Sequence, residues 1–125
     1  EREFAGLGDI VILEDETKIR VLSVTSATMS TYFTYQNTII DWTIANGINS
    51  DTASKYVRSL LEGLAIEGQA ATQAELPHLP VEHETPGGLN FRNRTGLQEQ
   101  GWFTDLYDRL QDTYTNADLK AKPKE

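Results

Sequence analysis

The chain has 125 residues, a formal net charge of −8 at pH 7 and no cysteine. This length fits one domain. The lack of cysteine excludes disulfides and thiolate zinc sites and favours a reducing, cytoplasmic setting. No apolar run approaches the roughly 18 residues of a transmembrane helix, and a nucleic-acid interface needs a basic surface, so we expect neither a membrane nor a nucleic-acid partner. A hydrophobic share of 38% is modest for a lone 14.0 kDa globule, which points to a partner subunit or a further domain.

The first expected element is a short strand near the N-terminus. Residues 10–13, Ile-Val-Ile-Leu, form a compact and largely β-branched apolar run. A single strand is not stable by itself, so we expect this one to pair with another chain or another domain. Residues 1–16 are therefore interpreted as the strand and its lead-in.

A long helix is expected from Thr17 to about Asn46. No proline or glycine interrupts this stretch, and its apolar residues recur mostly at spacings of three, four or seven. The segment 23–31 is rich in serine and threonine, which are mediocre helix formers, and is predicted to be a weak point where the helix bends. Gly47 is expected to end the helix.

A second, amphipathic helix is expected to run from the candidate N-cap residues 49–51 to about Gln69. After it the helical pattern stops. Residues 72–88 hold three prolines and two glycines, so they are expected to form a turn-rich connector.

Two more helices complete the prediction. The third is expected from Asn90 to Glu99, with Gly101 as the residue that stops it. The fourth carries an apolar stripe that begins at Phe103. The sequence thus predicts a mainly α fold. It is a helical bundle over residues 17–119 with a long first helix and a short N-terminal strand, followed by a tail over residues 120–125.

The sharpest candidate for a site is residues 84–90, Glu-Thr-Pro-Gly-Gly-Leu-Asn, directly before the third helix. The glycines allow backbone N–H groups to converge, and a helix start adds free N–H groups and a positive dipole end. This combination favours binding of a carboxylate or phosphate, to which Thr85 and Asn90 would add hydrogen bonds. The alternative is a tight turn in which Asn90 is merely the N-cap.

Other chemistry has weaker support. His78 and His83 lie five residues apart with Pro80 between them, which does not match a metal-binding pair, so we expect exposed loop histidines and no metal site. The sequence contains no nucleophile-elbow motif. It also contains neither G-x-G-x-x-G nor a P-loop, so a nucleotide-binding domain would have to lie elsewhere.

Four strings follow one another along the chain: Leu7–Val11 with acidic residues after it, Ser26–Tyr32, Thr85–Gly88 and Gln100–Phe103. In these strings and in the order of its elements, the chain from Leu7 to about Leu119 resembles the C-terminal dimerisation domain of the pyrroline-5-carboxylate reductase family. Thr-Pro-Gly-Gly stands where that family has Ser-Pro-Gly-Gly, and Gln-Gly-Trp-Phe is similar to its Gly-Gly-Phe.

The resemblance implies an interleaved homodimer formed through the long helices. It also implies NADP or NAD, bound by a Rossmann domain absent from this chain, with residues 1–16 leading in from that domain. The implied activity is NAD(P)H-dependent reduction of a cyclic imine acid, as in proline biosynthesis. The substrate is thus a small imine or amino acid, and this chain alone is not active.

The resemblance also assigns the site residues. Thr85, Pro86, Gly87, Gly88 and Leu89 would bind the substrate, and Asn90 would take the catalytic place of a threonine that hydrogen-bonds the substrate nitrogen. The family has Ala-Thr or Thr-Thr where this chain has Leu89 and Asn90. These two differences favour the alternative function, a non-catalytic helical dimerisation module that has lost reductase activity.

Overall fold

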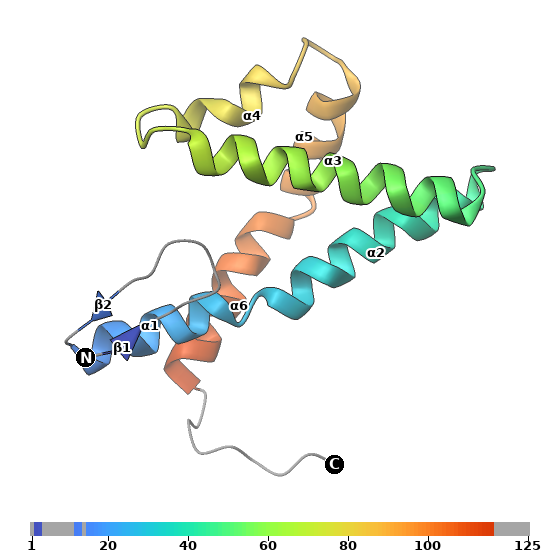
Figure 1. Ribbon diagram of the computed structural model, residues 1–125. Helices are drawn as coiled ribbons and strands as arrows, with labels where there is room; N and C mark the ends of the chain where they lie inside the picture. Colours follow the sequence, from blue (N-terminus) through green and yellow to red (C-terminus); the bar gives the residue numbers. More distant parts are fainter. Residues whose placement is uncertain (1, 4–11, 14, 117–125) are drawn as a thin grey trace. The chain divides into compact units, whose positions relative to one another are not determined.

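The computed structural model describes residues 2–3, 12–13 and 15–116, and this part of the chain is mainly helical (Figure 1). The chain divides into two units. One consists of the N-terminal residues up to Met29 together with the C-terminal residues from Gly101, and the other is the continuous segment Ser30–Gln100. We call them the terminal unit and the central unit.

In the terminal unit, two short strands pair antiparallel. Strand β1 (Arg2–Glu3) lies beside β2 (Ile12–Leu13), with Arg2 opposite Leu13. Of the strand predicted over residues 10–13, only the two residues of β2 are seen, because residues 10 and 11 lie outside the described part. The strand that pairs with β2 belongs to the same chain, whereas a partner from another chain or domain was expected.

The helical stretch predicted over residues 17–46 is present, but it is divided into two helices. Helix α1 (Glu16–Ser26) begins after the N-cap Asp15, whose Oδ1 accepts a hydrogen bond from the backbone N–H of Thr17 at 2.8 Å. Helix α2 (Met29–Ala45) follows after a turn at residues 27–28.

Hydroxyl side chains accompany this division. Thr25 Oγ1 donates a hydrogen bond to the carbonyl of Val21 at 3.1 Å, and Thr28 Oγ1 donates to the carbonyl of Thr25 at 2.9 Å. Such bonds compete with the backbone ladder and weaken the helix locally. The interruption falls inside the stretch 23–31 that was predicted to be a weak point.

Helix α6 (Trp102–Asn116) packs against α1 in the terminal unit. Arg20 of α1 reaches the last turns of α6, where its Nη2 donates to the carbonyl of Tyr114 at 3.2 Å. The guanidinium carbon also lies 5.1 Å from the centre of the Tyr114 ring. A cation near a helix C-terminus and over an aromatic face is favourable on both counts, so Arg20 holds the two helices together.

In the central unit, α2 is followed by α3 (Ser50–Ala70). Gly47 has a φ of +106°, and its N–H bonds the carbonyl of Ile44 at 3.1 Å, so it ends α2 as predicted. Asn49 Oδ1 accepts from the N–H of Thr52 at 2.9 Å and caps α3, which confirms the predicted start of this helix.

The buried apolar residues of the described part all lie on α3 and are spaced by four: Ala53, Val57 and Leu61. Residues four apart share one face of a helix. One face of α3 is therefore covered.

The connector predicted over residues 72–88 contains two short helical pieces, η1 (Leu76–His78) and α4 (Leu79–Glu82), each with a proline at its start. Helix α5 (Leu89–Glu99) follows, and Gly101 with a φ of +85° separates it from α6. The last two predicted helices are confirmed. Each helix end that was predicted lies within one residue of the observed end.

Candidate functional site

A tight turn of four residues leads into α5. The N–H of Gly88 donates to the carbonyl of Thr85 at 2.8 Å, with Pro86 second and Gly87, at a φ of +71°, third. Proline followed by a residue of positive φ is the pattern of a type II turn. Gly88 then serves as the N-cap of α5. The structure therefore brings the predicted residues Thr85 to Leu89 together at the start of a helix.

Thr85 lies directly over Gly88. A Cβ atom at position 88 would come within 2.3 Å of Thr85 Oγ1 and 3.2 Å of the Thr85 carbonyl oxygen. A side chain at this position would force the Thr85 hydroxyl to move and would press on the Thr85 carbonyl oxygen. Gly88 is thus required by the close approach of Thr85, a reason that the sequence motif did not reveal.

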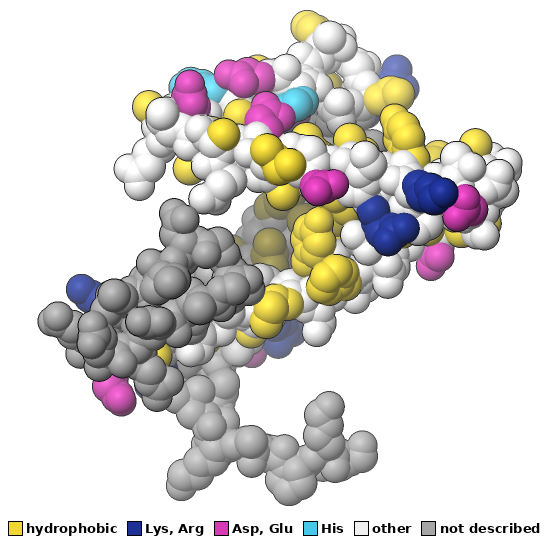
Figure 2. Space-filling model, viewed as in Figure 1, with side chains coloured by type: hydrophobic (Ala, Val, Ile, Leu, Met, Phe, Trp, Pro, Cys, Tyr) yellow, Lys and Arg dark blue, Asp and Glu magenta, His cyan; other side chains and the backbone are white. Residues whose placement is uncertain are grey.

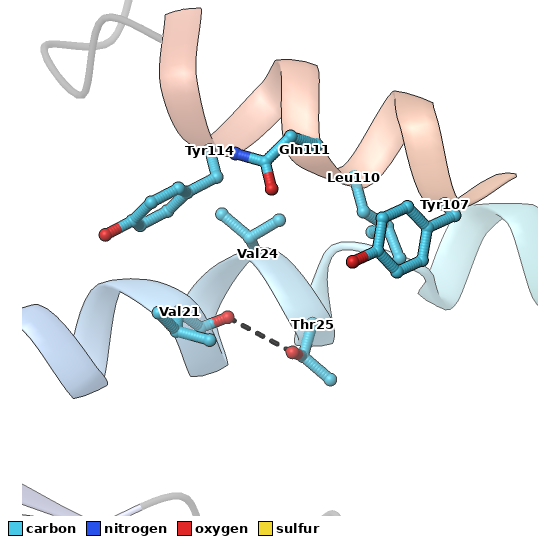
Figure 3. A pocket seen from close by; sticks show the side chains of 7 residues that line it. All are labelled: Val21, Val24, Thr25, Tyr107, Leu110, Gln111 and Tyr114. Carbon is cyan, nitrogen blue, oxygen red and sulfur yellow. Dashed lines mark hydrogen bonds between the residues drawn. The ribbon is translucent and has the colours of Figure 1, made fainter. Parts of the chain in front are cut away.

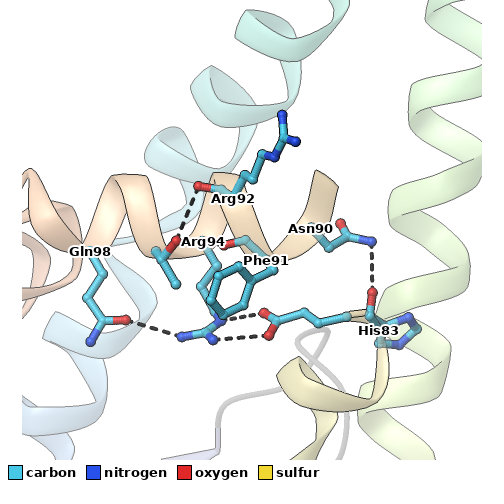
Figure 4. A network of polar contacts seen from close by, with 8 residues as sticks. His83, Asn90, Phe91, Arg92, Arg94 and Gln98 are labelled. Atoms are coloured by element: carbon cyan, nitrogen blue, oxygen red, sulfur yellow. Dashed lines mark hydrogen bonds and ion pairs between the residues drawn. The ribbon is translucent and has the colours of Figure 1, made fainter. Parts of the chain in front are cut away.

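The structure gives Asn90 a role other than that of an N-cap. Its side-chain Nδ2 donates to the carbonyl of His83 at 2.9 Å, and the N-cap position belongs to Gly88 (Figure 4). The interpretation of Asn90 as the N-cap is therefore wrong. Asn90 ties the end of the connector to the first turn of α5.

A second contact, which the sequence did not predict, joins Glu84 to α5. Its carboxylate accepts two hydrogen bonds from Arg94, one from Nε and one from Nη2 at 3.0 Å, and Arg94 Nη1 also donates to Gln98 at 3.2 Å (Figure 4). The Glu84 side chain is only 7% exposed. Hydrogen bonding by Arg94, aided by its charge, lowers the pKa of Glu84 although burial opposes this, and the same bond raises the pKa of Arg94.

A third tie joins the connector to α3. His83 Nε2 lies 3.0 and 3.1 Å from the two carboxylate oxygens of Glu67, and both side chains are about half exposed. His83 is an exposed connector residue, as predicted, but it has a specific partner. In the described ranges, no three His, Cys, Asp or Glu side chains come together as ligands for a metal ion.

The turn and the start of α5 offer, at an open surface, the kind of donors that a small anion requires. The first turn of α5 leaves N–H groups without intrahelical acceptors, and its dipole favours negative charge. Arg92 Nε donates to the carbonyl of Gly87 at 3.1 Å, which brings a positive charge to the turn. Leu89 is 78% exposed, so its side chain offers no enclosure.

The terminal unit contains a separate pocket that the sequence did not predict. It has a volume of about 270 Å³ and lies between α1 and α6 (Figure 3). Its lining comes from both helices: Val21, Val24, Thr25, Tyr107, Leu110, Gln111 and Tyr114. In the sequence, only the apolar stripe of α6 indicated that this helix packs against another element, and it did not identify that element as α1.

No protein-family model matches the chain, and no match was found among curated proteins or among solved structures. The resemblance to the reductase family therefore rests on the four short strings and the order of elements alone. Over the residues that the structure describes, no helix is long and apolar enough to span a bilayer.

Proposed function

We propose that this chain is a helical self-association module, in which two copies meet through apolar faces of the helices of the central unit. The observation that supports the proposal is the distribution of apolar side chains. Across the described residues, large hydrophobic side chains are exposed on every helix, ten of the nineteen on α2 and α3, whereas the buried apolar residues are confined to a single row on α3. Figure 2 shows hydrophobic side chains gathered over α2 and α3 on one face.

Exposure on this scale favours an interface. Phe33 and Trp42 on α2 and Tyr56 and Ile66 on α3 are each more than half exposed. Burial of apolar surface is worth about 25 cal/mol per Å², and contiguous exposed apolar patches on soluble domains commonly mark contact sites. Phe33 and Trp42, nine residues apart, lie on opposite sides of α2, so pairing two copies through one face would remove one of them from water on each chain.

Sedimentation equilibrium of the 125-residue chain tests this proposal. The expected mass at micromolar concentration is twice 14.0 kDa. A mass of one chain across that range would overturn self-association. Circular dichroism on the same samples checks that the helices are formed.

A second candidate function is supported by the turn before α5. On this proposal the chain is the dimerisation and substrate-loop domain of a cytoplasmic pyrroline-5-carboxylate reductase-like enzyme. The turn Thr85–Gly88 and the first turn of α5 would hold the carboxylate of a cyclic imine acid through backbone N–H groups. The chain contributes binding and orientation of the substrate, and the described residues include no loop suited to a dinucleotide, so NADP or NAD would be bound by another domain.

The contact of Asn90 with His83 is compatible with this second candidate. An asparagine amide has two N–H donors and one carbonyl acceptor, and the bond to His83 uses one donor. The remaining donor and the carbonyl oxygen would serve the substrate nitrogen. Leu89 can contribute only its backbone N–H.

Two measurements separate the candidates. In this chain, titration with proline, a stable analogue of the substrate, should shift the amide resonances of Gly88 to Asn90, and Gly88→Val should abolish the shifts. In the longer protein that the reductase proposal requires, NADPH should be oxidised when pyrroline-5-carboxylate is added. A dimer that shows neither response is the non-catalytic module.

A further inference from the structure

We propose that the pocket between α1 and α6 binds a small, uncharged aromatic molecule that carries an N–H or O–H donor, such as an indole or a phenol. The pocket lies within the terminal unit. Both candidate functions rest on the central unit, so this inference goes beyond them and gives the terminal unit a binding function of its own.

The pocket is formed by one face of each helix. Its residues are spaced by three and four along α1 and by three, four and seven along α6, as expected for a single stripe on each helix. They are Val21, Val24 and Thr25 on α1 and Tyr107, Leu110, Gln111 and Tyr114 on α6 (Figure 3). The volume of about 270 Å³ lies slightly below the roughly 300–1,000 Å³ of sites for drug-sized ligands. One or two fused rings are therefore the size of ligand that fits.

The pocket is held at one end and accessible at the other. At the first end, Arg20 of α1 bonds the Tyr114 carbonyl at 3.2 Å and lies over the Tyr114 ring. At the other end, Tyr107 is 72% exposed, so a ligand can enter beside it. A site whose walls are fixed by their own contacts loses little free energy in ordering when a ligand binds.

The side chains of the lining favour an uncharged aromatic ring. The seven described residues of the lining include no Asp, Glu, Lys or Arg, so none of them compensates a charged ligand for the loss of its hydration. Val21, Val24 and Leu110 supply apolar contact. The tyrosine rings supply faces and edges, and aromatic rings prefer to pack on such partners in offset or edge-to-face arrangements.

The polar atoms of the lining favour a ligand that donates a hydrogen bond. Thr25 Oγ1 donates its one hydrogen to the carbonyl of Val21 at 3.1 Å, so towards a ligand this hydroxyl can only accept. Gln111 Nε2 donates to Thr115 at 2.8 Å, and its Oε1, which is an acceptor, points towards α1 (Figure 3). The Tyr107 hydroxyl can also accept. The ligand must therefore bring the N–H or O–H.

Titration of the isotope-labelled chain with indole and with benzofuran, followed by amide NMR, tests the inference. The two ligands have nearly the same shape, but benzofuran has a ring oxygen in place of the N–H. Indole should shift the resonances of Val24, Thr25 and Leu110 with a dissociation constant of about 0.1–1 mM. Benzofuran should bind about fivefold more weakly, because it lacks the hydrogen bond.

A pair of variants tests the acceptor. Gln111→Leu changes an exposed residue of α6 and should remove most of the preference for indole over benzofuran. Gln69→Leu makes the same change at an exposed position of α3, outside the terminal unit, and should leave the preference unchanged. Helical circular dichroism of both variants shows that folded chains are compared.

Three results would overturn the inference. Millimolar indole that leaves the resonances of the lining in place would show that the pocket is not a site. Equal binding of indole and benzofuran would exclude a ligand chosen for its donor. Tighter binding of indole-3-acetate than of indole would exclude an uncharged ligand. None of these results depends on whether the chain sediments as a dimer, so this inference and the proposed self-association can fail separately.

Discussion

The connector and α3 belong to the same unit, yet they are stabilised in opposite ways. The end of the connector is tied by polar contacts made within the chain: Asn90 to His83, Glu84 to Arg94, and His83 to Glu67. Helix α3 has one apolar row covered and another exposed. Polar pairs therefore fix the end of the connector, whereas apolar burial fixes one row of α3. Within the central unit, the two regions are held by different kinds of contact.

The largest expected effect concerns the covered row of α3. Leu61→Ala should lower the free energy of unfolding by about 2–5 kcal/mol, because it removes buried methyl groups and leaves a cavity. Leu64→Ala, on the exposed row, should cost much less in a dilute, monomeric sample. Urea unfolding followed by circular dichroism measures both. Equal losses would break the distinction between the two rows.

The next effect concerns the part-buried carboxylate of Glu84 in the connector. The pKa of Glu84 lies below its usual value of 4.5, so its pairing with Arg94 stabilises the fold above that pH and ceases to do so as pH falls through the lowered pKa. Glu84→Gln should lower the melting temperature at pH 7, and the difference from the unmodified chain should shrink below about pH 4. Glu62→Gln, an exposed glutamate on α3, is the control and should show no such trend.

A smaller effect is expected at the turn before α5. Gly87→Ala should cost about 1–2 kcal/mol, because its φ of +71° is unfavourable for a residue with a Cβ. Gly96→Ala, inside α5 where a Cβ meets nothing within 4 Å, should instead gain roughly 0.5–1 kcal/mol. Thermal unfolding of the pair measures the contrast. A gain at both positions would show that the turn does not hold its conformation.

The smallest effect is expected for the contact between the connector and α3. His83→Ala removes a bond to Glu67 between two half-exposed side chains, and such pairs contribute about 0–1 kcal/mol. Hydrogen exchange of the connector amides is a sensitive measurement of this change. A loss well above 1 kcal/mol would mean that the connector depends on α3 rather than on α5.

Local signals account for the parts of the fold that the sequence predicted. Gly47 and Asn49 act on their own neighbours, so the end of α2 and the start of α3 were predictable from single residues. The division at residues 27–28 was predictable only as a weak point. Threonine hydroxyls bond backbone carbonyls at this division, but Thr38 and Thr43 do the same inside uninterrupted α2, so such bonds alone do not set where a helix divides.

The candidate site was predicted in outline and missed in detail. Two glycines after a proline indicated the turn, because positive φ is a local requirement. The pairing of Glu84 with Arg94 spans ten residues and depends on how the connector returns to α5. The pocket between α1 and α6 joins segments from opposite ends of the sequence. Neither has a local pattern, so neither was predictable from one sequence.

The terminal unit is formed by both ends of the chain, and this has a consequence for folding order. The hydrogen bond between Arg20 and Tyr114 joins residues 94 positions apart, whereas the helices of the central unit follow one another directly. Contacts of long sequence separation carry a larger loop-closure cost and form later. During synthesis, α1 leaves the ribosome long before α6 exists. We therefore expect the central unit to fold first and α1 to wait for the last helix to be translated.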